Sequence, residues 1–161
     1  MKKIQLGGHK KGAPIRGYAL VDDADYEWLN QWEWSWNQGY ALRRTGSSKF
    51  KAEKSVHMHR AIMNPPKNKE VDHKDRNRSN NQRKNLRICT SQQNRGNTSA
   101  RKNSKSGILG VWWDKAQKRW HTKIGFRNKI YWLGSFVKKK DAVKARKDAE
   151  KKYLNNFAPK I

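Results

Sequence analysis

Positive charge limits what this chain can fold into. Its 161 residues include 38 Lys and Arg against 13 Asp and Glu, which gives a formal net charge of +25. With only 34% hydrophobic residues, the chain cannot bury one large core. Its 8 Trp nevertheless supply enough ring surface for small cores. We therefore expect either one domain or two to three small modules.

The same charge indicates a polyanionic partner. Of the 38 basic residues, 18 lie in residues 101–161, so the attraction is strongest in the C-terminal third. Nucleic acid is favoured over a membrane surface, because no basic amphipathic helix presents a large apolar stripe. A lysine coat that only confers solubility is the alternative. The sequence contains no run of about 18 apolar residues, so it predicts no transmembrane helix.

Cysteine content and the first residues bear on where the protein acts. Cys89 is the only cysteine, so neither an intramolecular disulfide nor a Cys-rich zinc site can form. The N-terminus lacks the apolar segment of a secretory signal. Both features predict a protein of the reducing cytoplasm.

Residues 1–54 predict a small Trp-rich module. We expect His9 to lie in an exposed N-terminal segment. Residues 15–21 alternate as a strand does, and residues 22–31 begin with acidic residues that favour a short helix. Residues 32–36 alternate Trp with polar residues and precede a Gly-containing turn, which predicts a β-hairpin with three indoles on one face. The indoles could stack on bases, but a small core is the favoured interpretation. Residues 46–54 are a polar connection.

Residues 55–97 form the second predicted module, and residues 98–106 a basic linker. Residues 56–63 have apolar periodicity typical of a strand or a short helix, and Pro65 and Pro66 stop it. Strands are expected at residues 70–73 and 86–90, on either side of a polar loop rich in Asn and Arg. A short helix is expected at residues 91–97.

Residues 107–161 predict a sheet covered by one helix. Short strands are expected at residues 110–114, 119–126 and 129–136, and Ala recurs at helical spacing from residue 138 to about 154. The expected fold class is α+β, ending in a three-stranded antiparallel sheet with one packed helix. The other face of that sheet would be open to a ligand.

Four residues of the second module carry the chemistry. Asp72 and Asn94 supply oxygen ligands suited to Mg²⁺ or Mn²⁺. The neighbouring His73, if neutral, can take a proton from an attacking water. With Asn85 between them, the order of these residues resembles the HNH endonucleases of the homing type, found in phages and mobile introns.

That resemblance covers roughly residues 55–97 and implies a central ββα-metal nuclease module acting on double-stranded DNA. It also implies a catalytic set in which His73 is the general base, Asp72 and Asn94 hold the metal, and Asn85 ties the loop to the His73 strand. The family's motif is His-Asn-His, and its third residue is Asn94 here rather than His. Because the paired cysteines of zinc-stapled relatives are absent, the loop must be held by hydrogen bonds from its Asn residues and by packing.

Two other metal sites were weighed against this one. Asp75 begins a faint calcium-loop spacing, but its twelfth position is Leu86, which offers no carboxylate. His57 and His59 would lie on one face of a strand and could bind zinc, yet no third or fourth ligand is evident. A structural or phosphate-contacting role is the favoured interpretation for both imidazoles.

Residues 106–158 resemble the APETALA/ethylene-response-factor DNA-binding domain, in the Gly107–Trp113 segment, the strands after it and the Ala-rich helix. The resemblance implies that the open face of the sheet enters the major groove. Period-two alternation then directs one set toward the helix, namely Val111, Trp120, Thr122, Ile124, Leu133 and Phe136. The DNA-binding set is Trp112, Arg119, His121, Lys123, Arg127, Lys129 and Trp132, with Asp114 and Ile130 on the same face. The plant family has arginines where Leu109 and Trp112 stand, so its base code does not transfer.

The favoured function is a metal-dependent, site-recognising DNA endonuclease that needs no small-molecule cofactor. The alternatives are a catalytically silent DNA-binding regulator and a protein that binds or cleaves RNA. The sequence leaves open the target site, nicking versus double-strand cutting, and the oligomeric state.

Overall fold

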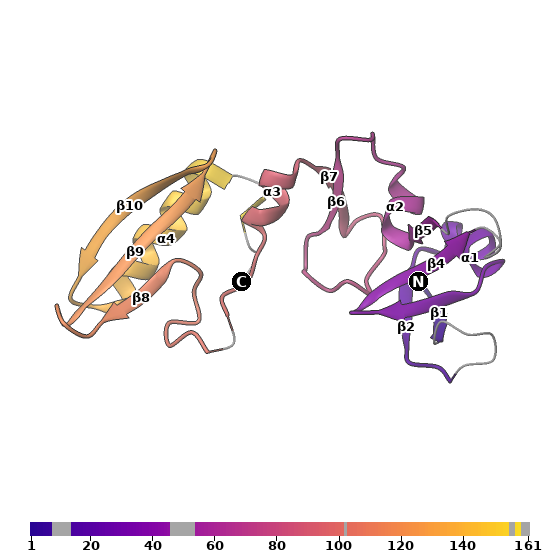
Figure 1. The fold of residues 1–161 in the computed structure, drawn as a ribbon, viewed down its shortest axis with the longest axis horizontal. Coiled ribbons are helices and arrows are strands. Elements are labelled where there is room, and N and C mark those ends of the chain that lie inside the picture. Colours follow the sequence, from indigo (N-terminus) through magenta and orange to yellow (C-terminus); the bar gives the residue numbers. More distant parts are fainter. Residues whose placement is uncertain (8–13, 46–53, 102, 155–156, 159–161) are drawn as a thin grey trace. The chain divides into compact units, whose positions relative to one another are not determined.

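A computed structural model describes residues 1–7, 14–45, 54–101, 103–154 and 157–158 (Figure 1). The expectations for His9 and for most of residues 46–54 therefore lie outside the described residues. The chain divides into two compact units, Met1–Thr90 and Ser91–Ile161. Each unit is described by itself below.

A five-stranded sheet forms the larger part of the first unit. Its order is β2-β1-β3-β4-β5, and every neighbouring pair is antiparallel except β1 with β3. The strands are β1 (Lys2–Gly7), β2 (Gly17–Val21), β3 (Trp34–Asn37), β4 (Tyr40–Thr45) and β5 (Lys54–His57). The predicted hairpin is confirmed in β3 and β4. Its turn residues Gln38 and Gly39 both have positive φ, 49° and 89°, as a type I′ turn requires.

Two helices and a second hairpin complete this unit. The helix expected at residues 22–31 is confirmed as α1 (Asp23–Asn30), with Asp22 at its N-cap position. Residues 56–63 are part strand and part helix, because β5 leads directly into α2 (Met58–Met63). The predicted strands after it are confirmed as β6 (Glu70–His73) and β7 (Leu86–Cys89), which pair antiparallel.

One core serves the whole first unit. Val71 and Leu86 of the β6–β7 hairpin belong to the same buried cluster as Ile4, Leu6 and Trp34 of the five-stranded sheet. The modules expected at residues 1–54 and 55–97 are thus joined, as far as Thr90, by shared packing and by the pairing of β5 with β4. Hydrophobic burial of this kind stabilises the parts only together.

The three indoles of the β3 region have different surroundings. Trp34 is 3% exposed and donates its indole N–H to the Leu29 carbonyl over 2.8 Å. Trp36 packs against the core and closely approaches Gly17. Trp32 is 47% exposed, and the Arg43 guanidinium lies over its ring. The core interpretation is therefore confirmed for Trp34 and Trp36, but it is wrong for Trp32.

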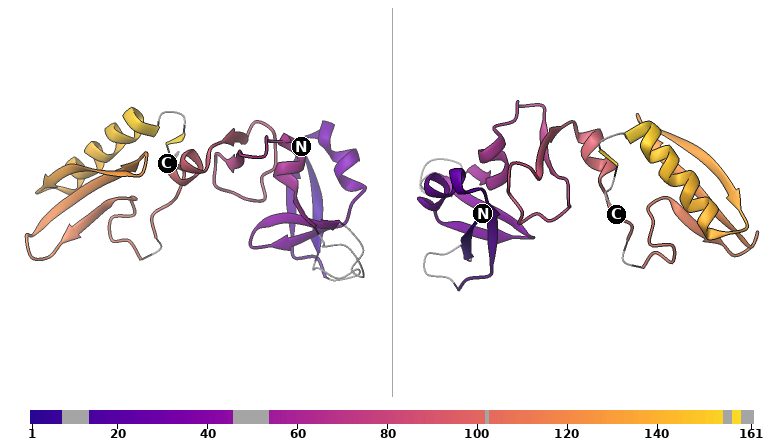
Figure 2. Two further views of the ribbon diagram at one scale, coloured as in Figure 1. Left: turned by 45° about the horizontal axis from the view of Figure 1, so that its top comes forward. Right: turned by 180° about the vertical axis from the view of Figure 1, so that it is seen from behind.

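The second unit contains a three-stranded antiparallel sheet in the order β10-β9-β8, with α4 along one face (Figures 1 and 2). Its elements are α3 (Ser91–Gly96), β8 (Val111–Asp114), β9 (Arg119–Phe126), β10 (Lys129–Phe136) and α4 (Lys139–Leu154). The predicted turn between β9 and β10 is confirmed, with positive φ at Arg127 and Asn128. Across the described ranges, no helix is both long and apolar enough to span a membrane.

Candidate active site

Strand β6 places Asp72 and His73 on opposite faces of its hairpin, because successive side chains alternate. Asp72 is 6% exposed and lies opposite Arg87 in the strand register. Arg87 donates to Asp72 Oδ2 from Nε over 2.8 Å and from Nη2 over 2.6 Å. The cross-strand ion pair thereby fixes the orientation of the carboxylate.

The side chain of Asn81 contacts the His73 ring. His73 Nε2 lies 3.3 Å from Asn81 Oδ1, and Asn81 is 1% exposed. The Asn81 amide nitrogen donates to the Ser79 carbonyl over 3.2 Å, so its oxygen is the group turned toward His73. With Asn81 Oδ1 as the acceptor, a neutral His73 imidazole would carry its proton on Nε2 and its lone pair on Nδ1.

An aromatic cluster surrounds the other side of this imidazole. The His59 ring lies 5.1 Å from that of His73, and Tyr40 contacts both, at 5.3 and 6.0 Å between centroids. His57 adjoins His59 and Tyr40, at 5.3 and 5.4 Å. A third imidazole, that of His73, thus lies beside the pair considered above as possible zinc ligands. In the part of the chain that the structure describes, however, no group of three or more His, Cys, Asp or Glu is arranged to hold a metal ion.

Burial controls the protonation of these imidazoles. Burial, together with the nearby His73, His57 and Arg60 charges, lowers the pKa of His59 to about 3. Burial likewise lowers the pKa of His73 below its usual value, against the opposing effect of its hydrogen bond with Asn81. His73 is therefore neutral at pH 7, which is the form that a general base requires.

Asn85 links the two ends of the loop between β6 and β7. Its side chain donates to Asp75 Oδ1 over 2.9 Å and to the Asn80 carbonyl over 2.8 Å. Its side-chain oxygen accepts from the Asp75 N–H, and its backbone carbonyl accepts from the Lys74 N–H. These bonds attach Asn85 to the residues directly after His73. The expectation that Asn side chains hold the loop is confirmed by them.

Asn94, the second expected metal ligand, lies in α3 of the second unit, whereas Asp72 belongs to the first unit. A carboxylate and an amide oxygen are the donor types that a hard divalent cation takes. By donor chemistry, the two residues fit a magnesium-type ion.

The sheet of the second unit carries an aromatic cluster on its open face. The rings of Trp112, His121 and Trp132 contact one another with centroids 5.0–5.8 Å apart, and Lys123 Nζ lies 5.4 Å from the Trp112 ring centroid. Lys139 of α4 instead lies over Trp120, so Trp120 is on the helix side of the sheet. Because side chains alternate along a strand, His121 and Lys123 are on the face turned away from the helix. The structure therefore brings these four predicted DNA-binding residues together.

His121 differs from its neighbours in exposure. Trp132 is 55% exposed, but His121 is only 6% exposed, because the two indoles cover it. Its Nε2 is buried and has no hydrogen-bond partner among the described residues. Strand alternation predicted the correct face of the sheet for His121, but it did not predict that Trp112 and Trp132 bury this side chain. Arg119 begins β9 opposite Asp114 and is exposed.

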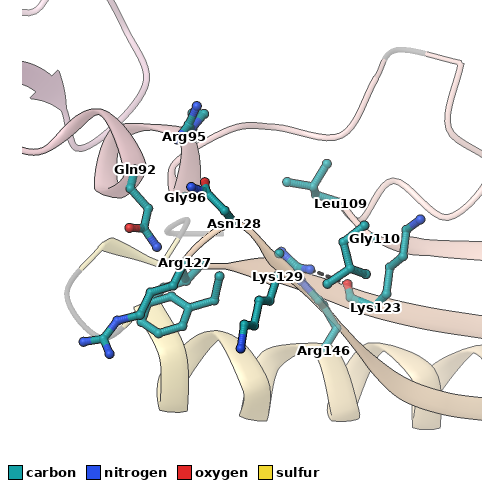
Figure 3. A pocket seen from close by; sticks show the side chains of 14 residues that line it. Gln92, Arg95, Gly96, Leu109, Gly110, Lys123, Arg127, Asn128, Lys129 and Arg146 are labelled. Carbon is teal, nitrogen blue, oxygen red and sulfur yellow. Dashed lines mark hydrogen bonds between the residues drawn. The ribbon is translucent and has the colours of Figure 1, made fainter.

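A pocket of about 530 Å³ lies at one end of this sheet (Figure 3). It is lined by side chains from α3, from the turn between β9 and β10, and from α4. Arg127 and Lys129, the remaining predicted DNA-binding residues, line it with Lys123. Figure 3 shows Arg146 reaching from α4 to the Lys123 carbonyl, and the Arg146 guanidinium also donates to Glu150 over 2.8 Å. Arg146 therefore has a structural role.

One comparison with known proteins gives a match, and the matched residues lie in the first unit and in α3. Searches of curated proteins and of solved structures find no match. A family model described as HNH endonuclease matches residues 61–95, which include Asp72, His73, Asn85 and Asn94. The sequence predicted a loop rich in Asn but did not assign Asn81 to His73. At residues 61–95 the chain is thus similar to the HNH endonucleases, and this similarity indicates a nuclease.

Proposed function

We propose that this protein is a metal-dependent endonuclease of the HNH homing type that hydrolyses phosphodiester bonds of double-stranded DNA. The observation that carries the proposal is the HNH endonuclease match at residues 61–95, within which His73 is buried, neutral and within hydrogen-bond distance of Asn81. The net charge of +25 is suited to a polyanionic substrate.

In the proposed reaction, His73 Nδ1 takes a proton from a water molecule. The water oxygen forms a bond to phosphorus while the bond from phosphorus to the 3′ oxygen breaks, and the leaving oxygen takes a proton from solvent. Asn85 holds the loop against the residues that follow His73. Asp72 and Asn94 would hold Mg²⁺ or Mn²⁺, which, when bound, stabilises negative charge on the leaving oxygen.

The second unit is proposed to bind the DNA through the open face of its sheet. Support comes from the cluster of Trp112, His121 and Trp132 and from Lys123 beside it. The proposed contacts continue through Arg119, Arg127 and Lys129. An antiparallel sheet with one covered face also agrees with the resemblance to the APETALA domain. Cations would contact phosphates, and polar groups in the groove would read base edges.

The test is plasmid cleavage by the full chain. We expect supercoiled plasmid to become open-circular or linear in the presence of Mg²⁺, and cleavage to stop when a chelator is added. His73→Ala should reduce the rate by about two to four orders of magnitude, while DNA affinity stays near that of the parent. Binding without cleavage by the parent would favour the silent regulator, and preferential cleavage of RNA would favour an RNA enzyme.

A further inference from the structure

The N-terminal sheet is bonded to the loop that holds His73. The Leu20 N–H of β2 donates to the Ser79 carbonyl over 2.8 Å, and the Leu20 carbonyl accepts from the Asn81 N–H over 2.8 Å. Leu20 and Asn80 thus form a parallel β-bridge at the free edge of β2. The backbone of Asn81 is consequently fixed by a strand that lies 60 residues earlier in the chain.

Acidic side chains at the start of α1 hold the next part of the loop. Asp22 accepts from Gln82 Nε2 over 3.1 Å and from the Arg83 N–H over 2.8 Å. Asp25, which is 3% exposed, accepts two bonds of 2.8 Å from the Arg83 guanidinium. These hydrogen bonds lower the pKa of Asp25 against the effect of burial. The carboxylate therefore stays ionised at neutral pH, and the contact is charge-assisted.

The turn between β3 and β4 holds the loop on the other side. The Gln38 carbonyl accepts from Arg78 Nη1 over 3.0 Å, and the Gly39 carbonyl accepts from Ser79 Oγ over 3.1 Å. The Arg78 guanidinium also lies over the Tyr40 ring, which contacts His73. Residues 78–83 are thus bonded to three different elements of the N-terminal part of the chain.

We propose that Asn81 is a positioning residue for His73, and that the N-terminal sheet sets Asn81 in place. The proposal rests on the proposed function only in taking His73 as the base. Because Asn81 Oδ1 accepts the Nε2 proton, Nδ1 keeps its lone pair. Without that acceptor, the buried imidazole loses the hydrogen bond that favours protonation at Nε2, so the other tautomer and other ring angles become populated.

The first readout is the tautomer of His73, measured by ¹⁵N NMR of the full chain at neutral pH without DNA. The His73 signal is assigned by its absence in His73→Ala. We expect Nε2 to be protonated in the parent and in Asn68→Leu, a control at an exposed Asn. Asn81→Leu, which keeps the size and removes the acceptor, should give mixed tautomers, whereas Asn81→Asp should keep protonated Nε2.

The second readout is the kinetics of plasmid cleavage. Asn81→Leu should lower kcat about 10- to 100-fold, in the range found for partners that orient a reactive group, and leave KM unchanged. Asn81→Asp should restore most of kcat, because its carboxylate oxygen also accepts the Nε2 proton.

The two readouts separate the inference from the proposed function. A parent that fails to cleave DNA contradicts the nuclease, while its tautomer still tests the role of Asn81. If Asn81→Leu does not fold, Asn81→Ala, which lacks the acceptor, and Asn81→Asp, which keeps one, supply the comparison. The inference is overturned if His73 in the parent carries its proton on Nδ1, or if the variants that lack the acceptor keep the parental tautomer.

Discussion

The imidazoles of His59 and His73 meet edge to face, with their ring centroids 5.1 Å apart. Both side chains are buried, at 8% and 4% exposure, and burial lowers both pKa values. Charging either ring would place a cation in an apolar setting beside the other ring. The pair therefore favours two neutral imidazoles, and one of them is the proposed base.

The first prediction concerns the pH dependence of cleavage. Because burial lowers the pKa of His73, the rising limb of kcat/KM should have its midpoint below pH 6.5, the ordinary value for His. Activity should thus be lost as pH falls through that lower pKa. The measurement is initial cleavage rate against pH at low substrate, with DNA affinity measured at each pH as the control. A midpoint above pH 7 would contradict the neutral, buried state of the base.

The second prediction concerns stability. The pKa of His59 is about 3 in the folded protein and near 6.5 when unfolded, so the unfolded chain binds more protons between these values. Stability is then complete above pH 6.5 and falls as the pH is lowered, by up to about 1.4 kcal/mol per pH unit for one such group. Urea unfolding between pH 7 and 4.5 measures this loss. His59→Phe should flatten the dependence, and an equal slope in both proteins would refute it.

The third prediction concerns DNA binding by the open sheet face. Lys123→Ala should weaken every duplex alike and lower the salt slope by about 0.9 if the ammonium neutralises a phosphate. It should instead weaken the preferred sequence by about 1–3 kcal/mol if the ammonium contacts a base edge. Titrations with preferred and scrambled duplexes at several salt concentrations distinguish the two. Lys147→Ala, at an exposed position on α4, is the matched control. Parental binding by Lys123→Ala would remove this residue from the interface.

The fourth prediction compares two glycines of the second unit. Both have positive φ, 76° at Gly110 and 71° at Gly107. A Cβ at Gly110 would overlap the Lys123 carbonyl and would lie 2.7 Å from Arg146 Nη1, whereas a Cβ at Gly107 meets nothing within 4 Å. Gly107→Ala should therefore cost about 1–2 kcal/mol for its backbone conformation alone, and Gly110→Ala clearly more. Thermal unfolding of the full chain measures both, and equal losses would contradict the close approach.

Local patterns predicted most of the secondary structure. The bounds of β9 and β10 follow from alternation on either side of a two-residue turn, a signal that depends on neighbouring residues alone. Strand β1 was missed, although Ile4 and Leu6 alternate with exposed residues. Its Lys residues and following glycines resemble a polar tail. The strand is stabilised by pairing with β2 and in parallel with β3, and that partnership has no local signature.

The sequence likewise predicted one part of the candidate site and not the other. The spacing of His73 and Asn85 pointed to one loop, because both residues flank it in sequence. The roles of Arg87 and Asn81 depend on strand register and on the fold of that loop, which the motif does not specify. The contact of His59 with His73 joins two elements through packing, so the spacing of His57 and His59 gave no sign of it and raised a zinc pair only as a disfavoured alternative.

The shared core of the first unit has a consequence for protein engineering. A fusion that grafts only residues 55–97 onto another DNA-binding protein would strip Val71 and Leu86 of the apolar partners supplied by Ile4 and Trp34. The grafted hairpin would present that surface to water and aggregate. A fusion protein that is meant to keep this hairpin folded must therefore include strands β1 to β4 as well as residues 55–97.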